Sequence, residues 1–161
     1  MSDMRGFKST NEMDASIIEI WNNIIHTGDE VYHLGDFGFG KEKEISKYRS
    51  QLNGKVNLIL GNHDYKNSID KLGKLFTSVS DLKTIKYNHE RIILCHYAMR
   101  VWSASHHNSY HLFGHSHGLL NTYGKSFDIG WDVWGKPLNI SEVIDEFNKL
   151  PDNFNFIKEE E

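Results

Sequence analysis

Four short segments of the sequence place metal-binding side chains directly after a glycine or at the end of an apolar run. They are residues 35–36 (Gly-Asp), 61–64 (Gly-Asn-His-Asp), 95–96 (Cys-His) and 114–117 (Gly-His-Ser-His). Glycine lets the backbone turn sharply and approach an ion closely. Carboxylate, amide oxygen and imidazole groups suit Mn, Fe, Zn or Ni. The segments together predict a site for a divalent transition metal.

Each segment taken alone also has a simpler structural interpretation. A Gly-Asp pair such as residues 35–36 is typical of an ordinary turn, and a single histidine such as His96 is typical of a hydrogen-bonded core residue. Residues 61–64 favour a functional role on their side-chain chemistry, and His115 and His117 share one side of an extended segment, as a chelate requires. The occurrence of all four segments in one short chain favours the metal site.

The loop between two of these segments carries weaker candidates for substrate binding. Trp102, His106 and His107 lie on or near it. Loops at strand ends often line substrate clefts, but plain packing explains these side chains equally well.

The apolar pattern predicts the elements that position the four segments. A helix is expected over residues 10–25, because Ser9 and Glu12 have capping-box spacing before it and Gly28 follows it. The order of elements indicates a mixed α/β fold, in which ligands bind at the carboxyl ends of strands. The other expected helices cover residues 45–52, 69–75 and 141–150, and the expected strands cover residues 31–34, 56–60, 82–87, 91–94, 110–113, 122–123 and 127–133.

Length and composition limit the class of protein. The 161 residues fit one domain over residues 1–161, with irregular ends at residues 1–8 and 152–161. The net charge of −4 argues against a general nucleic-acid-coating surface, although a metal ion can reverse the local field for a phosphate substrate. The first residues lack the apolar region that is typical of a signal peptide, and the sequence contains no run of roughly 20 apolar residues. Its single cysteine, Cys95, cannot form an internal disulfide. We therefore expect a soluble cytoplasmic protein without a membrane partner.

The four segments, in this order, resemble the motifs of the calcineurin-like metallophosphoesterases. Residues 31–37 and 111–118 are especially similar to the small bacterial and phage members, and the resemblance extends from about residue 7 to residue 147. It implies a four-layer α-β-β-α sandwich with mixed sheets and metals at the strand ends. It also implies a hydrolase that acts on a phosphodiester or phosphomonoester, here expected to be nucleotide-like.

The resemblance further implies a role for each matched metal ligand. Asp36 would bridge two metal ions. Asn62, His96 and His115 would complete one site, and His117 would serve the other. Two divalent ions about 3.5–4 Å apart can hold a hydroxide nucleophile and neutralise phosphate oxygens.

For the matched catalytic residues, the resemblance implies that His63 contacts the phosphate and assists the leaving group, with Asp64 orienting it. A neighbouring imidazole can donate a proton to a departing alkoxide. No covalent enzyme intermediate is then required.

The start of the chain departs from the family pattern. Family members begin with a strand that ends in Asp-x-His and supplies two further ligands, whereas here no apolar strand precedes Asp3 and Arg5 stands where a histidine is expected. One site thus keeps four ligands and the other keeps Asp36 and His117, so we expect one ion to bind well and the second weakly. The absence of that strand also exposes a sheet edge, which predicts a homodimer through edge pairing.

Two alternatives follow from this departure. The first alternative to an active phosphoesterase is a catalytically degenerate family member that binds a phosphorylated ligand or a host protein as a regulator. The second is that translation starts upstream and that the given sequence is shortened at its first strand.

Overall fold

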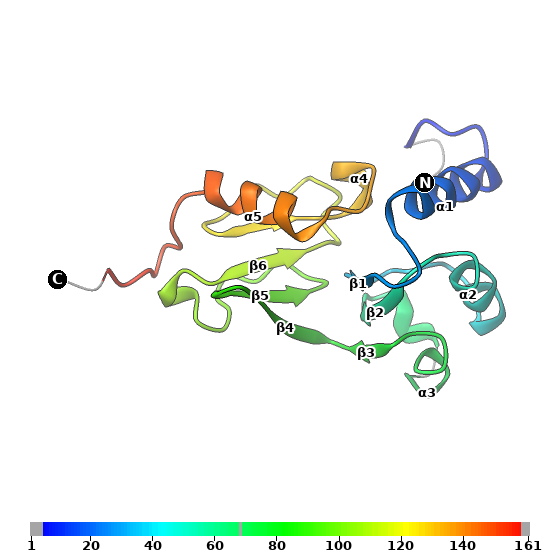
Figure 1. Ribbon diagram of the computed structural model, residues 1–161, viewed down its shortest axis with the longest axis horizontal. Helices are drawn as coiled ribbons and strands as arrows, with labels where there is room; N and C mark the ends of the chain where they lie inside the picture. The colour runs from blue at the N-terminus through cyan, green and yellow to red at the C-terminus, as the bar shows by residue number, and fades with distance from the viewer. Residues whose placement is uncertain (1–4, 68, 159–161) are drawn as a thin grey trace.

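Two sheets form the centre of the molecule. The computed structural model describes residues 5–67 and 69–158, and Figure 1 shows the sheets end to end along the long axis. The first sheet is parallel, with the order β1 (Glu30–His33), β2 (Lys55–Ile59), β3 (Ser78–Ser80). The second is mixed: β4 (Leu82–Tyr87) pairs antiparallel with β5 (Glu90–Cys95), and β6 (Tyr110–Phe113) and β7 (Ser126–Asp128) continue it in parallel. The α/β fold class predicted from the sequence is confirmed.

Helices cover the two ends of this arrangement. The α1 helix (Thr10–Ile24) begins where predicted, because the Ser9 side chain accepts a hydrogen bond from the Glu12 N–H. Figure 1 shows α1, α2 (Glu42–Arg49) and α3 (Ile69–Leu72) around the first sheet, and α4 (Trp131–Trp134) and α5 (Ile140–Lys149) over the second. Two 3₁₀ turns, Asp64–Lys66 and Ser105–His107, follow strands β2 and β5. Within the described residues, no helix is long and apolar enough to cross a membrane.

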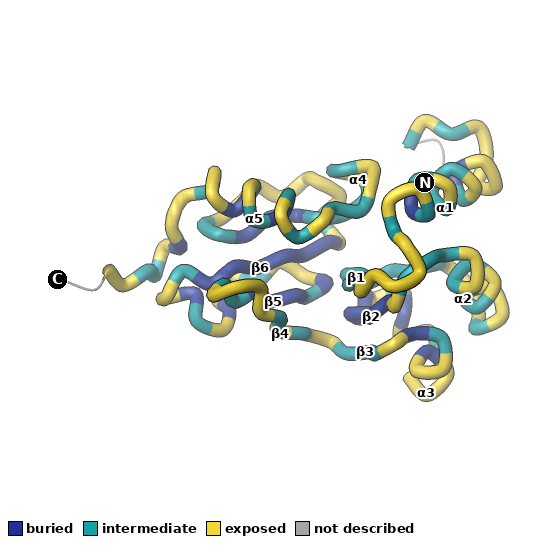
Figure 2. The backbone as a smooth tube through the Cα atoms, viewed as in Figure 1, coloured by how far each residue is buried: buried dark blue, intermediate teal, exposed yellow. Residues whose placement is uncertain are grey.

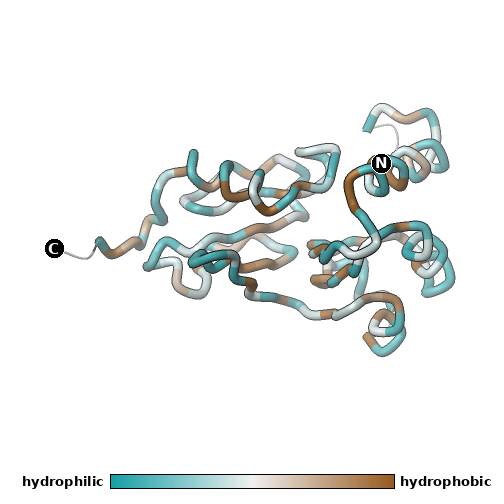
Figure 3. Tube along the Cα trace, viewed as in Figure 1, coloured by the Kyte–Doolittle hydropathy of each residue, from teal (hydrophilic) through white to brown (hydrophobic). Residues whose placement is uncertain are grey.

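The β2 strand connects the two hydrophobic cores. Figure 2 shows it buried between the two halves, and Figure 3 shows apolar residues on it. Successive side chains of a strand point to opposite faces, so Leu58 packs with Trp21 of α1 while Ile59 packs with Leu94 and Val143 in the other core. The end of β2, which carries residues 61–64, is therefore fixed at the junction of the two halves.

Two predicted strands differ from the structure, and one observed strand was not predicted. Residues 122–123 lie in irregular loop structure, and the strand expected over residues 127–133 ends at Asp128. The Asp128 carboxylate accepts a hydrogen bond from the Gly130 N–H, which turns the chain into α4. The short strand β3 was not predicted, because it has only three residues and a single apolar one, Val79.

β1 is an edge strand, paired only with β2 among the described residues. A cavity of about 770 Å³ lies beside it, with walls from α1, the second sheet and the start of α5. The walls are mostly apolar, and Asp36, His96 and His115 line part of the cavity. An edge at this place agrees with the sequence analysis, and its pairing with a second copy of the chain stays a prediction.

Candidate metal centre

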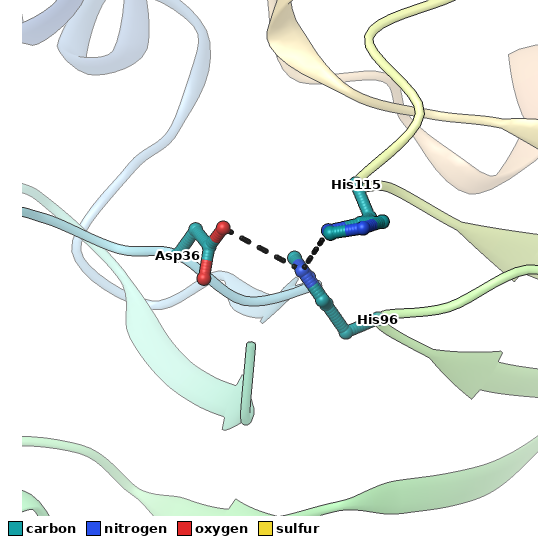
Figure 4. A group of neighbouring side chains, drawn as sticks. All are labelled: Asp36, His96 and His115. Atoms are coloured by element: carbon teal, nitrogen blue, oxygen red, sulfur yellow. Dashed lines mark hydrogen bonds and ion pairs between the residues drawn. The ribbon is translucent and has the colours of Figure 1, made fainter. Parts of the chain in front are cut away.

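The carboxyl ends of four strands meet between the two sheets. Asp36 follows β1, Asn62 follows β2, His96 follows β5 and His115 follows β6. Figure 4 shows Asp36, His96 and His115 pointing toward one another, and their ligand atoms all lie within 4.8 Å of each other. We call Asp36, Asn62, His96 and His115 the central cluster.

His96 lies at the middle of the central cluster. Its Nε2 atom is 3.2 Å from Asn62 Oδ1, 3.2 Å from His115 Nδ1 and 3.5 Å from Asp36 Oδ2. Its Nδ1 atom lies 2.7 Å from the Leu34 carbonyl oxygen, which only accepts, so the ring proton is assigned to Nδ1. In the neutral ring Nε2 then carries a lone pair that faces oxygen lone pairs of Asn62 and Asp36. Such a convergence of lone pairs fits a bound cation.

The backbone at several predicted ligands is strained. Asp36, His115 and His117 have φ values of +53°, +62° and +49°. Side chains other than glycine rarely adopt this left-handed region, and such strain persists where the surrounding structure enforces it, often at functional sites. Strain at three predicted ligands supports a functional role for them.

Two glycines allow the loops of the central cluster to approach closely. A Cβ atom at Gly61 would lie 2.3 Å from Asp36 Oδ1, and one at Gly35 would lie 2.5 Å from His96 Nδ1. Real Cβ atoms do not make such contacts. Glycine at both positions is therefore required for the observed geometry, as the sequence pattern indicated.

Asp64 holds the loops that follow β1 and β2. It is buried, and its carboxylate accepts hydrogen bonds from the backbone N–H groups of Asp36 (2.7 Å), Gly61 (2.9 Å) and Phe37 (3.1 Å). The carboxylate thus fixes the backbone of two loops that carry ligands. The orienting role toward His63 that the resemblance implies stays a prediction.

Asp128 holds the turn that carries His115 and His117. The sequence analysis did not predict a role for Asp128. Its Oδ2 atom accepts hydrogen bonds from the Ser116 hydroxyl (2.5 Å) and the Gly118 N–H (3.0 Å). The residue is buried at the end of β7. Each half of the centre therefore has one buried carboxylate that ties down its loops.

His63 lies beside the central cluster. Its backbone N–H donates to Asp36 Oδ1 at 2.8 Å, and its ring atom Nε2 is 4.0 Å from Asp36 Oδ2. The ring packs against Phe39 with centroids 4.5 Å apart. Its Nδ1 atom is buried and has no hydrogen-bond partner within the described part of the chain. The ring is thus held at the centre with Nε2 directed to the Asp36 side.

His117 lies apart from the central cluster. Its Nδ1 atom is 2.5 Å from Asp132 Oδ2, and Asp132 also accepts hydrogen bonds from the Arg5 guanidinium at 2.5 and 3.0 Å. These bonds, above all those from Arg5, lower the pKa of Asp132 to about 2. Sequence analysis missed Asp132, and Asp3 lies outside the described residues.

The three weaker substrate-binding candidates lie elsewhere. Trp102 is buried; its indole N–H donates to the Ser109 carbonyl, and its ring packs on His111. His106 and His107 are exposed on a 3₁₀ turn, with rings 4.1 Å apart. The described lining of the cavity that reaches the central cluster includes none of the three.

Comparison with known proteins agrees with this geometry. The family model "Calcineurin-like phosphoesterase superfamily domain" matches residues 10–128. The chain is 28% identical over 151 residues to the uncharacterized protein MJ1445 of Methanocaldococcus jannaschii, covering 87% of this chain and 78% of that protein. It is 24% identical over 171 residues to the Gene 66 protein of Mycobacterium phage L5, covering 86% and 83%.

A solved structure shows the same fold. The protein of unknown function AQ665 from Aquifex aeolicus superposes with a TM-score of 0.67 over 90% of both chains, at 22% sequence identity. The family model spans more than half of the chain and includes the segments that carry Asp36, Asn62, His96 and His115. The chain therefore belongs to the calcineurin-like phosphoesterase superfamily.

Proposed function

We propose that the protein is a metal-dependent phosphoesterase whose metal centre is the central cluster. The observation that carries this proposal is the convergence of the His96 Nε2 lone pair with oxygen atoms of Asn62 and Asp36 at 3.2–3.5 Å. Family membership supports hydrolysis of phosphoester bonds. The set of two imidazoles, one amide and one carboxylate fits Mn, Fe, Zn or Ni.

The charge balance of the central cluster suits a phosphate substrate. A bound divalent ion supplies a Lewis acid that activates water and neutralises phosphate oxygens. Asp36 brings the only formal negative charge among the four side chains, because Asn62 and the imidazoles of His96 and His115 are neutral ligands. The loaded site therefore keeps a net positive charge, which favours an anionic phosphoester.

His63 is placed to donate a proton to the leaving group. Its Nε2 atom is on the Asp36 side of the ring, 4.0 Å from Oδ2, and the packing of the ring against Phe39 restricts its orientation. Imidazole is the side chain that exchanges protons near neutral pH. Protonation of the departing alkoxide lets the P–O bond break without release of a strong base.

Two exposed aromatic rings beside the centre support a nucleotide-like substrate. Tyr97 is 43% exposed, with its ring centroid 4.9 Å from those of both His96 and His115, and Phe39 is 54% exposed beside His63. Stacking of a base on an aromatic side chain is worth about 1–3 kcal/mol. We therefore favour a phosphodiester or phosphomonoester that carries an aromatic base.

The test is Mn²⁺-dependent hydrolysis of bis(p-nitrophenyl) phosphate and p-nitrophenyl phosphate. We expect the wild type to hydrolyse at least one of them and Asp36→Asn to lose that activity, whereas His63→Ala should keep much of it, because a p-nitrophenolate leaving group needs no proton. Asp145→Asn on the exposed side of α5 and His89→Ala in the β4–β5 turn are matched controls that should keep the activity. Mn²⁺ binding without hydrolysis of these compounds or of nucleotides would contradict the proposal and favour a binding or regulatory protein.

A further inference from the structure

Three side chains from distant parts of the chain form a second polar group at the cavity. We call Arg5, Asp132 and His117 the rim array. Arg5 Nε donates to Asp132 Oδ1 at 2.5 Å, its second nitrogen donates to Oδ2 at 3.0 Å, and Oδ2 lies 2.5 Å from His117 Nδ1. All three residues line the cavity that also contains Asp36, His96 and His115.

The contacts of the rim array decide which nitrogen of His117 carries the proton. An ionised carboxylate only accepts hydrogen bonds, so the proton of the neutral ring belongs on Nδ1, facing Asp132. The His117 Nε2 atom is then left with a lone pair. A carboxylate partner on one ring nitrogen is the usual device that fixes a histidine whose other nitrogen binds a metal.

Arg5 fixes the carboxylate in turn. Its guanidinium binds both oxygens of Asp132, a two-point contact that sets the plane of the carboxylate as well as its place. The other end of the guanidinium contacts Met13 Sδ of α1 at 3.8 Å. The segment before α1 is thereby connected to α4 and to the turn that carries His117.

An ordinary surface ion pair does not explain this arrangement. The side chains of Arg5 and Asp132 are only 20% and 22% exposed, whereas exposed pairs are mobile and contribute little. His117 is half exposed, so its ring would rotate freely without a partner, yet its backbone is held in the strained left-handed region. The contacts of the rim array therefore fix an imidazole that is half exposed to solvent.

We propose that Asp132 is a positioning residue that fixes His117 with its Nε2 atom free to bind a second divalent ion, and that Arg5 holds Asp132 in place. The metal function of His117 rests on the proposed phosphoesterase function. The assignment of Arg5 and Asp132 rests on the contacts of the rim array alone.

The first test measures the His117 ring without any metal. Nitrogen-15 NMR of the metal-free full chain should show the Nδ1–H form in the wild type. Asp132→Ala should give a mixture of the two neutral forms, and Arg5→Lys, which keeps the charge but loses the two-point contact, should fall between them. A wild-type ring protonated on Nε2 alone, or an unchanged ring in Asp132→Ala, would overturn the positioning role.

The second test is calorimetric titration of the same proteins with Mn²⁺. We expect a tight and a weak step in the wild type, with the weak step weakened about 10–100-fold in Asp132→Ala and the tight step unchanged. Asp132→Asn, which keeps the shape of the side chain, should show a smaller loss. Asp145→Ala and Arg100→Lys, in residues outside the cavity lining, are matched controls that should bind as the wild type does.

The outcomes separate the two proposals. If the Mn²⁺ titration of the wild type shows no tight step, the proposed function is contradicted. The NMR result would still decide the role of Asp132. A tight step without a weak one, or a weak step that Asp132→Ala leaves intact, would overturn the second-ion assignment. In the Zn²⁺-loaded protein, coordination of His117 through Nδ1 would overturn it as well.

Discussion

Three members of the central cluster, Asp36, His96 and His115, line the same cavity as the rim array, but the two groups are held by different means. The loops of the central cluster are fixed by glycine contacts and by buried carboxylates, Asp64 and Asp128, that bind backbone amides. Asp128 also holds the backbone turn of His117, but the side chains of the rim array are fixed by one another, and the His117 side chain is half exposed.

The difference predicts an order of metal binding. Ligands fixed through the backbone lose little freedom when an ion binds, whereas side chains held by one another must be ordered together. The central cluster should therefore bind the tight ion and the rim array the weak one.

Asp36→Asn should abolish the tight site and with it the hydrolysis. Loss of the charged ligand removes metal-based stabilisation worth several kcal/mol, so the rate should fall by about 10⁴-fold. The variant should still fold, because an amide oxygen can keep the bond from the His63 N–H. Metal content and rate are measured together; a variant with full Mn²⁺ content and full rate would refute the assignment.

His63→Ala should lower the rate of hydrolysis without weakening metal binding. We expect both Mn²⁺ steps to remain and the rate to fall by about 10²–10⁴-fold on a substrate with an alkoxide leaving group. The loss should be much smaller on an aryl ester, whose leaving group needs no proton. Equal losses on both esters would contradict the role of His63 as a proton donor.

Asp64→Ala should destabilise the fold more than any change in the rim array. It leaves three backbone amides without their acceptor, each worth about 1–3 kcal/mol when buried, so the free energy of unfolding should fall by about 3 kcal/mol or more. Asp132→Ala should cost far less, because it removes contacts between side chains and leaves no backbone amide without its acceptor. Urea denaturation of the metal-free variants compares them, and equal losses would remove the contrast between the two regions.

The smallest effect concerns His111, a buried histidine of β6. Burial lowers the pKa of His111 in β6, and its Nε2 atom accepts a hydrogen bond from the Met99 N–H. Below the ordinary value of 6.5 the unfolded chain takes up a proton that the folded chain resists, so stability should decrease as the pH falls. His111→Asn should flatten, but not abolish, the change in Tm between about pH 7 and about pH 5, because burial also lowers the pKa of His33. An unchanged slope in the variant would exclude His111 as a cause.

The sequence predicted the strands that end at the metal centre, because local apolar runs and glycines mark them. Four of the predicted ligands lie together for that reason. The roles of Asp132 and Arg5 depend on a contact between residues 127 positions apart, which no local spacing reveals. Trp102 has the residue type of a cleft residue, but only the packed structure shows it turned toward His111.

The misread segment at residues 127–133 has a similar cause. Its aromatic and branched residues favour a strand, but the hydrogen bond from the Gly130 N–H to the Asp128 carboxylate ends β7 and starts α4. That same turn brings Asp132 to His117. The turn that the sequence analysis did not predict is therefore the one that positions the rim array.

The most direct test of the central cluster is anomalous diffraction at the manganese edge from crystals soaked in Mn²⁺. We expect a strong peak bounded by Asp36, Asn62, His96 and His115, and a weaker peak at His117 Nε2. The absence of the strong peak, with His96 Nε2 bonded to water alone, would contradict the assignment of the metal centre.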